Sequence, residues 1–166
     1  MGFLTGKRLL ITGVLSNRSI AYGIAKACHR EGAELAFSYV GERFKDRITE
    51  FAAEFNSTAI YDCDVADDAD MDAAFAAVEK AWGKLDYLVH AIGFADKQYL
   101  RGRYLDTPRD AFLQAMDISC YSFVAVGRRA AALMTLTRVV RAGEHAGVTP
   151  DGPKGPARVC KPGVVS

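Results

Sequence analysis

The sequence predicts an α/β fold in which helices cover both faces of a parallel sheet. Short apolar runs of strand length alternate with longer segments whose apolar residues recur at helical spacing, and this alternation continues to about residue 123. Such a pattern is typical of a doubly wound sheet of the Rossmann type. A chain of 166 residues favours a single domain, which we expect to span residues 1–140.

The first two strand-helix units lie between residues 9 and 55. Leu9 to Ile11 is a short apolar run, and helical spacing begins at Ile20 and ends in a polar stretch before Gly32. Residues 34–39 (ELAFSY) predict a second strand. Apolar side chains then recur at intervals of three and four over residues 44–55, which predicts a second helix with one apolar face.

The third unit follows the same order. Residues 59–61 predict a short strand, and residues 71–82 carry the next helical stripe. Aspartates before this stripe, Asp67 among them, are suited to cap the helix and to favour its positive end. Residues 85–92 (LDYLVHAI) predict the fourth strand, which ends before Gly93.

A long helix is predicted after Thr107, because threonine followed by proline is a favoured helix start. It is expected to run to about Gly127, with an inward face made of four residues: Phe112, Met116, Ser119 and Phe123. Residues 130–140 are compatible with a fifth strand near Met134, although no turn residue separates them from the helix. Residues 141–166 contain five glycines, four prolines and no aromatic residue, which predicts a disordered tail.

The composition argues against several partners and sites. With 21 basic and 20 acidic residues, no overall charge favours nucleic acid or an anionic membrane. No apolar segment approaches the roughly 18 residues that a membrane span needs, and the N-terminus does not resemble a signal peptide. The cysteines are widely spaced, which predicts reduced thiols in the cytoplasm and no metal site: Cys28, Cys63, Cys120 and Cys160.

The stretch TGVLSNRSIAYGIA, residues 12–25, joins the first strand to the first helix. In this position a glycine turn can direct backbone N–H groups at a pyrophosphate, but the usual G-x-G-x-x-G spacing is absent. The alternative is structural: Gly13 permits a tight turn, and Gly23 lets the helix lie close to the sheet. The short polar side chains of the loop and the cation Arg18 favour the binding interpretation.

Two other strand ends are candidates for the same groove. An aspartate in CDVADD, residues 63–68, could accept a hydrogen bond from an adenine amino group, although the motif taken without the others favours helix capping. Gly93 in HAIGFA could admit a ribose and nicotinamide, or could simply end the strand. His90 is expected in the core, and Cys63 and Cys120 are expected to be buried thiols without a nucleophilic role.

Taken together, these motifs resemble one family. MGFLTGKRLLITG, SNRSIAYGIAKACHREGAELAFSYVG, FAAEF, CDVADDAD, HAIGFA and DISCYSF are similar to the N-terminal half of the bacterial NADH-dependent enoyl-(acyl-carrier-protein) reductases, a divergent branch of the short-chain dehydrogenase/reductase family. The likeness extends from residue 1 to about Phe123. It implies that the first loop holds the cofactor pyrophosphate despite its glycine spacing.

The resemblance also implies which residues form the site. Seven positions match the family's contacts to the cofactor phosphates, ribose groups and adenine: Gly13, Ser19, Ile20, Asp64, Val65, Ile92 and Gly93. Ala95 matches a backbone contact to the acyl substrate. Three positions depart from the family pattern, because Val40 stands where a polar residue is frequent, Ala91 replaces a serine, and Asp96 replaces a proline.

The catalytic pair of the family has no counterpart here. The family uses a Tyr-x6-Lys pair after its fifth strand, in which the tyrosine stabilises and protonates the enolate and the lysine holds the nicotinamide ribose. No tyrosine follows Tyr121, so we assign no catalytic residue and expect a fold that is incomplete at its C-terminal side. A frameshift, a truncated product and a genuinely short protein all remain open explanations.

The resemblance implies NADH-dependent reduction of trans-2-enoyl thioesters of acyl carrier protein in fatty-acid elongation. NADH is expected in preference to NADPH, although Arg43 could suit a 2′-phosphate. The alternatives are an inactive remnant or nucleotide-binding module, and a different Rossmann enzyme such as a methyltransferase. The latter would need an acid at the end of the second strand, where Glu42 is the nearest. Family members form homo-tetramers, but a monomer or dimer is expected here.

Overall fold

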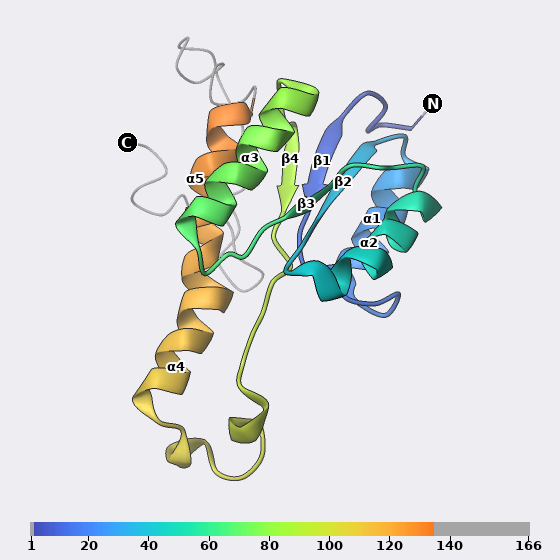
Figure 1. Cartoon of the computed structure of the whole chain (residues 1–166). Coiled ribbons are helices and arrows are strands. Elements are labelled where there is room, and N and C mark those ends of the chain that lie inside the picture. The colour runs from blue at the N-terminus through green and yellow to red at the C-terminus, as the bar shows by residue number, and fades with distance from the viewer. Residues whose placement is uncertain (1, 135–166) are drawn as a thin grey trace, which may run out of the picture.

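The computed structural model describes residues 2–134, which form one sheet with helices on both faces (Figure 1). The strands stand in the order β3-β2-β1-β4, and every neighbouring pair is parallel. They are β1 (Arg8–Ile11), β2 (Glu34–Tyr39), β3 (Ile60–Asp62) and β4 (Tyr87–Val89). The α-helices are α1 (Ile20–Arg30), α2 (Glu42–Glu54), α3 (Asp68–Trp82), α4 (Arg109–Met116) and α5 (Ser122–Leu133). The predicted doubly wound fold is confirmed.

Two apolar layers lie on opposite faces of the sheet, between the strands and the helices that cover each face in Figure 1. Alternate residues of a strand point to opposite faces, so Leu9 and Ile11 of β1 pack towards α1 and α2, whereas Leu10 packs towards α3 and α5. Phe37 of β2 is completely buried in the first layer, and Ala36 is completely buried in the second. Because both faces are covered, the strands carry nearly continuous apolar runs, as expected for a parallel sheet.

Side-chain caps fix where two helices begin. Ser19 caps α1, because its Oγ accepts a hydrogen bond from the Tyr22 N–H at 3.2 Å. Asp67 caps α3, and its Oδ1 accepts from the Ala69 N–H at 2.8 Å. Each cap pairs an N–H group that the helix itself leaves without a partner. The predicted aspartate cap of the third helix is therefore confirmed.

The long helix after Pro108 differs from the prediction in its inward face. It is interrupted by a π-helical turn, η3 (Asp117–Tyr121), between α4 and α5, and α4 extends away from the sheet (Figure 1). None of the four expected inward residues is buried: Phe112, Met116 and Phe123 are 43–60% exposed, and Ser119 is exposed as well. The buried face of α5 is formed mainly by smaller residues: Ser122, Ala125, Val126, Ala130 and Leu133. These let α5 approach α3 closely, and the larger apolar residues remain outside.

The start of the predicted fifth strand is wrong. Ala130 lies inside α5 and is completely buried, because the helix continues to Leu133. Met134 forms a single parallel bridge with Leu85, and the Leu85 N–H donates to the Leu133 carbonyl at 3.0 Å. The remaining part of that predicted strand, the boundary at residue 140 and the predicted tail at 141–166 lie outside the described residues.

The segment between β4 and α4 contains two short 3₁₀ helices, η1 (Lys97–Tyr99) and η2 (Tyr104–Asp106), at the far end from the sheet (Figure 1). Its apolar side chains are exposed: Leu100, Tyr104 and Leu105 are each at least 68% exposed. Within residues 2–134, no helix combines the length and the apolar character required to cross a membrane.

A buried carboxylate, Asp86, holds the amino ends of β1 and β4 together. Its side chain is 7% exposed and accepts hydrogen bonds from the Arg8 N–H at 2.9 Å and from Lys7 Nζ at 3.3 Å, while Lys84 Nζ lies 3.6 Å away. Burial opposes ionisation, but the Arg8 N–H and the two ammonium groups outweigh it and lower the pKa of Asp86. Its stabilising contribution is therefore present above the ordinary aspartate pKa and is lost as the pH falls through the lowered value.

We expect Asp86→Asn to lower the free energy of unfolding by about 1–3 kcal/mol at pH 7, because hydrogen bonds to a charged group are lost. The difference from the wild type should shrink as the pH falls below about 3.9, the ordinary aspartate pKa, because the wild-type carboxylate is then progressively protonated. Urea unfolding at several pH values measures this. Asp106→Asn is the matched control, since that carboxylate is exposed and pairs with nearby Arg103. A difference in the free energy of unfolding between the wild type and Asp86→Asn that does not change with pH would contradict the lowered pKa of Asp86.

Candidate functional site

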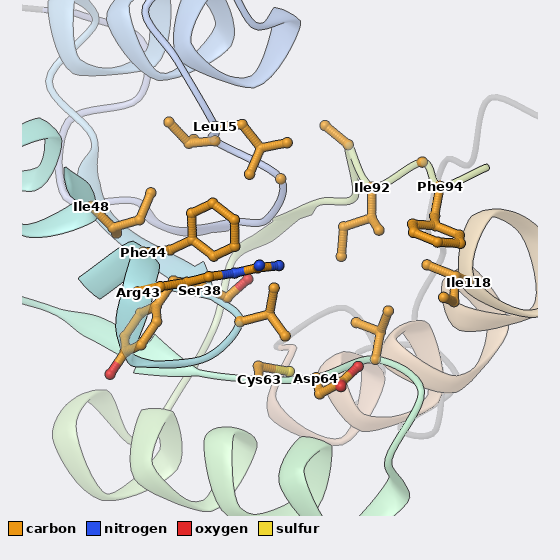
Figure 2. Close-up of a pocket in the computed structure, with 17 residues that line it drawn as sticks. Leu15, Ser38, Arg43, Phe44, Ile48, Cys63, Asp64, Ile92, Phe94 and Ile118 are labelled. Atoms are coloured by element: carbon orange, nitrogen blue, oxygen red, sulfur yellow. The ribbon is translucent and has the colours of Figure 1, made fainter. Parts of the chain in front are cut away.

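A cavity of about 370 Å³ lies at the carboxyl ends of the strands. Its walls come from the segments that follow β1, β2, β3 and β4, together with the start of α2 (Figure 2). The chain moves from β1 to β2 and β3 on one side and then returns to place β4 on the other side of β1. The cavity therefore adjoins the point where the strand order reverses, which is where ligands bind in open α/β sheets.

The structure brings most of the predicted cofactor residues together. Five line this cavity, from three different strand ends: Gly13, Asp64, Val65, Ile92 and Gly93. This clustering follows from the parallel sheet, because all its strands end at the same edge.

Three predicted residues lie outside the cavity lining. Ser19 is engaged in its own turn and helix, because its Oγ donates to the Ser16 carbonyl at 2.7 Å and accepts from the Tyr22 N–H. The Ile20 side chain is 79% exposed, and Ala95 is exposed and absent from the cavity lining. The roles predicted for them in binding the cofactor and the acyl substrate thus remain predictions.

Gly13 has a structural reason to be glycine. Its φ is +81°, in the left-handed region, and a Cβ at this position would overlap the carbonyl group of Ala91. The first loop therefore lies directly against the segment after β4, and no side chain separates them. Gly23 is different, because a Cβ there would meet nothing within 4 Å. The suggestion that Gly23 is needed for close packing of the helix on the sheet is wrong.

Thr12 joins the same two segments by hydrogen bonds. Its backbone N–H donates to the Val89 carbonyl at 2.9 Å, and its Oγ1 donates to the same carbonyl at 3.0 Å. The Oγ1 also accepts from the Ala91 N–H at 3.3 Å. Thr12 is 1% exposed, so these bonds satisfy a polar side chain that water does not reach. They fix the position of Ala91 and of the cavity wall that follows it.

The third strand contributes Cys63, Asp64 and Val65. Asp64 Oδ1 accepts from the Ala66 N–H at 2.9 Å, which holds the turn into α3. Cys63 is buried, and burial raises the pKa of its thiol to about 11. A thiol with this pKa is protonated at neutral pH and is a poor nucleophile, as predicted. Cys120 is exposed on η3, so its expected burial is wrong; it lies on the outer side of the long helix.

His90 lies next to the cavity lining but not in it. Its Nε2 forms a hydrogen bond with Ser122 Oγ at 2.8 Å, and that Oγ donates to the Ile118 carbonyl at 2.6 Å. Burial lowers the pKa of His90, so the ring is neutral at pH 7. The expected structural role is supported by these contacts, because the imidazole links the end of β4 to the start of α5.

Several lining residues were not predicted. They are Leu15 after β1, Ser38 in β2, Phe44 and Ile48 in α2, Phe94 after β4, and Ile118 in η3. Phe44 and Ile48 were assigned only to the apolar stripe of the second helix, and no sequence signal distinguished the cavity from the core. Ile118 reaches the cavity because Ser119 Oγ bonds both the N–H and the carbonyl of Phe94, at 2.9 and 3.0 Å.

The chemical character of the cavity is mainly apolar, with charge at two positions. Among the described lining residues, Arg43 is the cation and Asp64 is the anion (Figure 2). An apolar slot with a few polar groups suits a flat heterocycle such as adenine, which needs faces to pack against and a few hydrogen-bond partners at its edge.

Comparison with known proteins gives one consistent result. The family model described as enoyl-(acyl carrier protein) reductase matches residues 13–142. The NADH-dependent enoyl-(acyl-carrier-protein) reductase of Salmonella typhimurium is 54% identical over 129 residues, which cover 77% of this chain and 49% of that protein. The chain thus spans about half the length of the curated relatives it matches.

Solved structures show the same likeness. The enoyl-(acyl-carrier-protein) reductase of Anaplasma phagocytophilum, solved in complex with NAD, is 43% identical with a TM-score of 0.78, over 82% of this chain and 53% of that one. The enzyme of Bacillus cereus, solved with NADP⁺ and an indole naphthyridinone, is 39% identical with a TM-score of 0.78, over 81% of this chain and 53% of that one. The chain belongs to the enoyl-(acyl carrier protein) reductase family.

Proposed function

We propose that this chain is the cofactor-binding part of an NADH-dependent enoyl-(acyl-carrier-protein) reductase, which reduces trans-2-enoyl thioesters in fatty-acid elongation. The observation that carries the proposal is the cavity at the strand-order reversal, where Gly13, Asp64 and Ile92 meet from three strand ends. The family membership and the NAD complex of a relative support the choice of ligand.

The residues of the cavity have distinct roles in this proposal. The backbone around Gly13, which lies against the Ala91 carbonyl and lines the cavity, approaches the dinucleotide. Asp64 and the Val65 N–H hold the adenine edge, and Ile92 and Gly93 approach the nicotinamide-side ribose through their backbone. NADH supplies a hydride when bound. The chain's own contribution is to bind and orient the cofactor and to keep water from the apolar part of the slot.

Titration calorimetry with NADH tests the proposal. The wild type is expected to bind, and Asp64→Ala to bind about tenfold more weakly, because one hydrogen bond from the adenine amino group to a charged acceptor is lost. Asp70→Ala is the matched control: it removes a carboxylate six residues later on the exposed side of α3 and should change the affinity by less than twofold. Absence of NADH binding by the folded wild-type chain, checked by circular dichroism, would contradict the proposal.

A second candidate is a nucleotide-binding module that turns nothing over. The sequence favours it in one respect, because no tyrosine follows Tyr121 and the Tyr-x6-Lys pair implied by the resemblance is therefore not present. NADH binding without enoyl reduction would support this candidate. The methyltransferase alternative has no support, since the relatives are reductases and β2 ends without an acid.

We infer a cytoplasmic protein whose substrate is delivered by acyl carrier protein.

The exposed side of the long helix supports self-association. Large apolar residues of α4, η3 and α5 border a shallow groove there: Leu113, Met116, Tyr121 and Val124. These side chains are 43–55% exposed in the single chain. Burying them against a second copy would be favourable, since transfer of apolar area from water contributes about 25 cal/mol per Å². A homo-oligomer built on this face is therefore part of the proposal.

A further inference from the structure

We propose that Ser119 is a positioning residue of the cavity: its hydroxyl holds the backbone of Phe94 and thereby orients the wall that receives the nicotinamide half of the dinucleotide. This inference rests on the proposed function, because it concerns how the same groove holds its cofactor. Ser119 Oγ accepts a hydrogen bond from the Phe94 N–H at 2.9 Å and donates to the Phe94 carbonyl at 3.0 Å. One side chain thus pairs both backbone polar groups of a residue 25 positions earlier in the chain.

The wall in question, residues 92–94, has few other attachments. It follows β4, lies in neither a helix nor a strand, and lines the cavity. In the described part of the chain, the two bonds to Ser119 are the hydrogen bonds that tie this wall to another segment. The Ala91 N–H, just before the wall, donates to Thr12 Oγ1. The wall is therefore fixed at its start by Thr12 and at its end by Ser119.

The π-helical turn η3 brings Ser119 to this wall. A π turn contains one residue more than an α-helical turn, so it shifts the side chains around the helix axis, and such turns are frequent at functional sites. Ile118, the preceding residue of η3, lines the cavity together with Phe94, and Figure 2 shows both on the same side of it. The turn therefore supplies an apolar side chain to the cavity and a hydroxyl group to its wall.

The exposure of this contact indicates that it orders the wall more than it stabilises the fold. Ser119 is exposed and Phe94 is 41% exposed, so water can replace the hydroxyl at both backbone groups, and the free energy of unfolding depends little on it. Water does not replace the fixed orientation. A wall released by Ser119→Ala must be ordered again when a ligand binds to it, and that entropy cost weakens binding.

Only the part of the ligand that contacts the wall incurs this cost. In the proposed function the adenine lies against Asp64 and Val65, which follow a different strand, β3. ADP contains the adenosine and the pyrophosphate but not the nicotinamide half. Removal of the Ser119 hydroxyl should therefore weaken NADH and leave ADP almost unchanged, whereas general damage to the fold would weaken both.

The test measures the dissociation constant of NADH by fluorescence titration and that of ADP by its competition with NADH. The ratio Kd(NADH)/Kd(ADP) should rise about tenfold in Ser119→Ala, the ordering cost of roughly one backbone residue. Ser119→Thr keeps the hydroxyl and should restore the ratio to within about twofold of the wild type. Cys120→Ala is the matched control, because it changes the next residue of the same exposed turn, on the outer groove, and should leave the ratio unchanged.

Hydrogen exchange of the Phe94 amide, followed by NMR in the unliganded protein, provides a second readout. Exchange should be faster in Ser119→Ala than in the wild type, because the amide loses its acceptor, and unchanged in Cys120→Ala. Urea unfolding of the same variants checks that each is folded.

A rise of about threefold or more in Ser119→Ala, reversed by Ser119→Thr, supports the inference. A smaller rise overturns it, as does an equal weakening of NADH and ADP, which would make Ser119 a structural residue. An equal rise in Cys120→Ala, a rise that Ser119→Thr does not reverse, or unchanged exchange of the Phe94 amide also overturns it. NADH binding by the wild type without competition from ADP refutes this inference but not cofactor binding. Failure of the wild type to bind NADH refutes the proposed function, and this inference with it.

Discussion

Gly13→Ala is expected to lower the free energy of unfolding substantially and to abolish NADH binding. The left-handed conformation at φ +81° costs an alanine about 1–3 kcal/mol, and its Cβ would also overlap the Ala91 carbonyl. The segment after β4 must move to relieve that overlap, and this segment carries Ile92 and Gly93 into the cavity. Urea unfolding and NADH titration measure the two effects.

Gly23→Ala is the control for that substitution. Gly23 lies within α1, and an added Cβ meets nothing within 4 Å. Replacing a helical glycine by alanine should raise the free energy of unfolding by about 0.5–1 kcal/mol and leave NADH binding unchanged. The opposite pattern, with Gly13→Ala neutral and Gly23→Ala destabilising, would show that the close contact between the first loop and Ala91 does not exist in solution.

The second large effect concerns turnover. A polypeptide of these 166 residues is expected to reduce a crotonyl thioester at least about 10²- to 10³-fold more slowly than the full-length Salmonella typhimurium relative. Loss of a group that stabilises developing negative charge costs this much alone, and the resemblance implies that a lysine that would hold the nicotinamide ribose is missing as well. The assay follows NADH oxidation at 340 nm with saturating cofactor, so that weak binding cannot imitate slow chemistry.

A rate equal to that of the relative would refute this account of the catalytic groups. The same samples should be titrated with NADH, because binding without turnover separates the two functions proposed for the chain. Adding the purified C-terminal half of the Salmonella typhimurium enzyme provides a further readout. Any recovered turnover would show that the cavity described here holds its cofactor in a productive orientation.

Local patterns predicted most of the fold because local rules decide it. The start of α1 was predicted from the apolar spacing that begins at Ile20, and the start of α3 from the aspartates around Asp67. Both signals lie within a few residues of the helix start. The face of the long helix could not be predicted in this way. Spacing identified Phe112 and Met116 as an apolar stripe, but the packing of α5 on α3 depends on the small side chains of Ala125 and Ala130. Which face of the long helix is buried depends on the distance between α5 and α3, and no local sequence pattern encodes that distance.

Some residues of the candidate site could likewise be predicted from local patterns, and others could not. Asp64 and Gly93 could be identified because parallel strands end at one edge, so residues just after strands must meet. Ser19 has the right residue type in the right loop, yet its hydroxyl is committed to the α1 cap. Phe44 and Ile48 were missed for the opposite reason, since a residue that lines a cavity and a residue that fills a core produce the same helical periodicity.

The two hydrogen bonds of the Thr12 hydroxyl have a consequence for the thermodynamics of association. They connect β1 to the segment after β4, so the two sides of the strand-order reversal move as one body before any ligand arrives. A ligand that enters between them need not freeze two independent loops, each of which would cost about 1–2 kcal/mol per residue in backbone entropy. The entropy cost of ordering the groove is met when the protein folds. The affinity of a ligand there therefore reflects its contacts and not the ordering of the two loops.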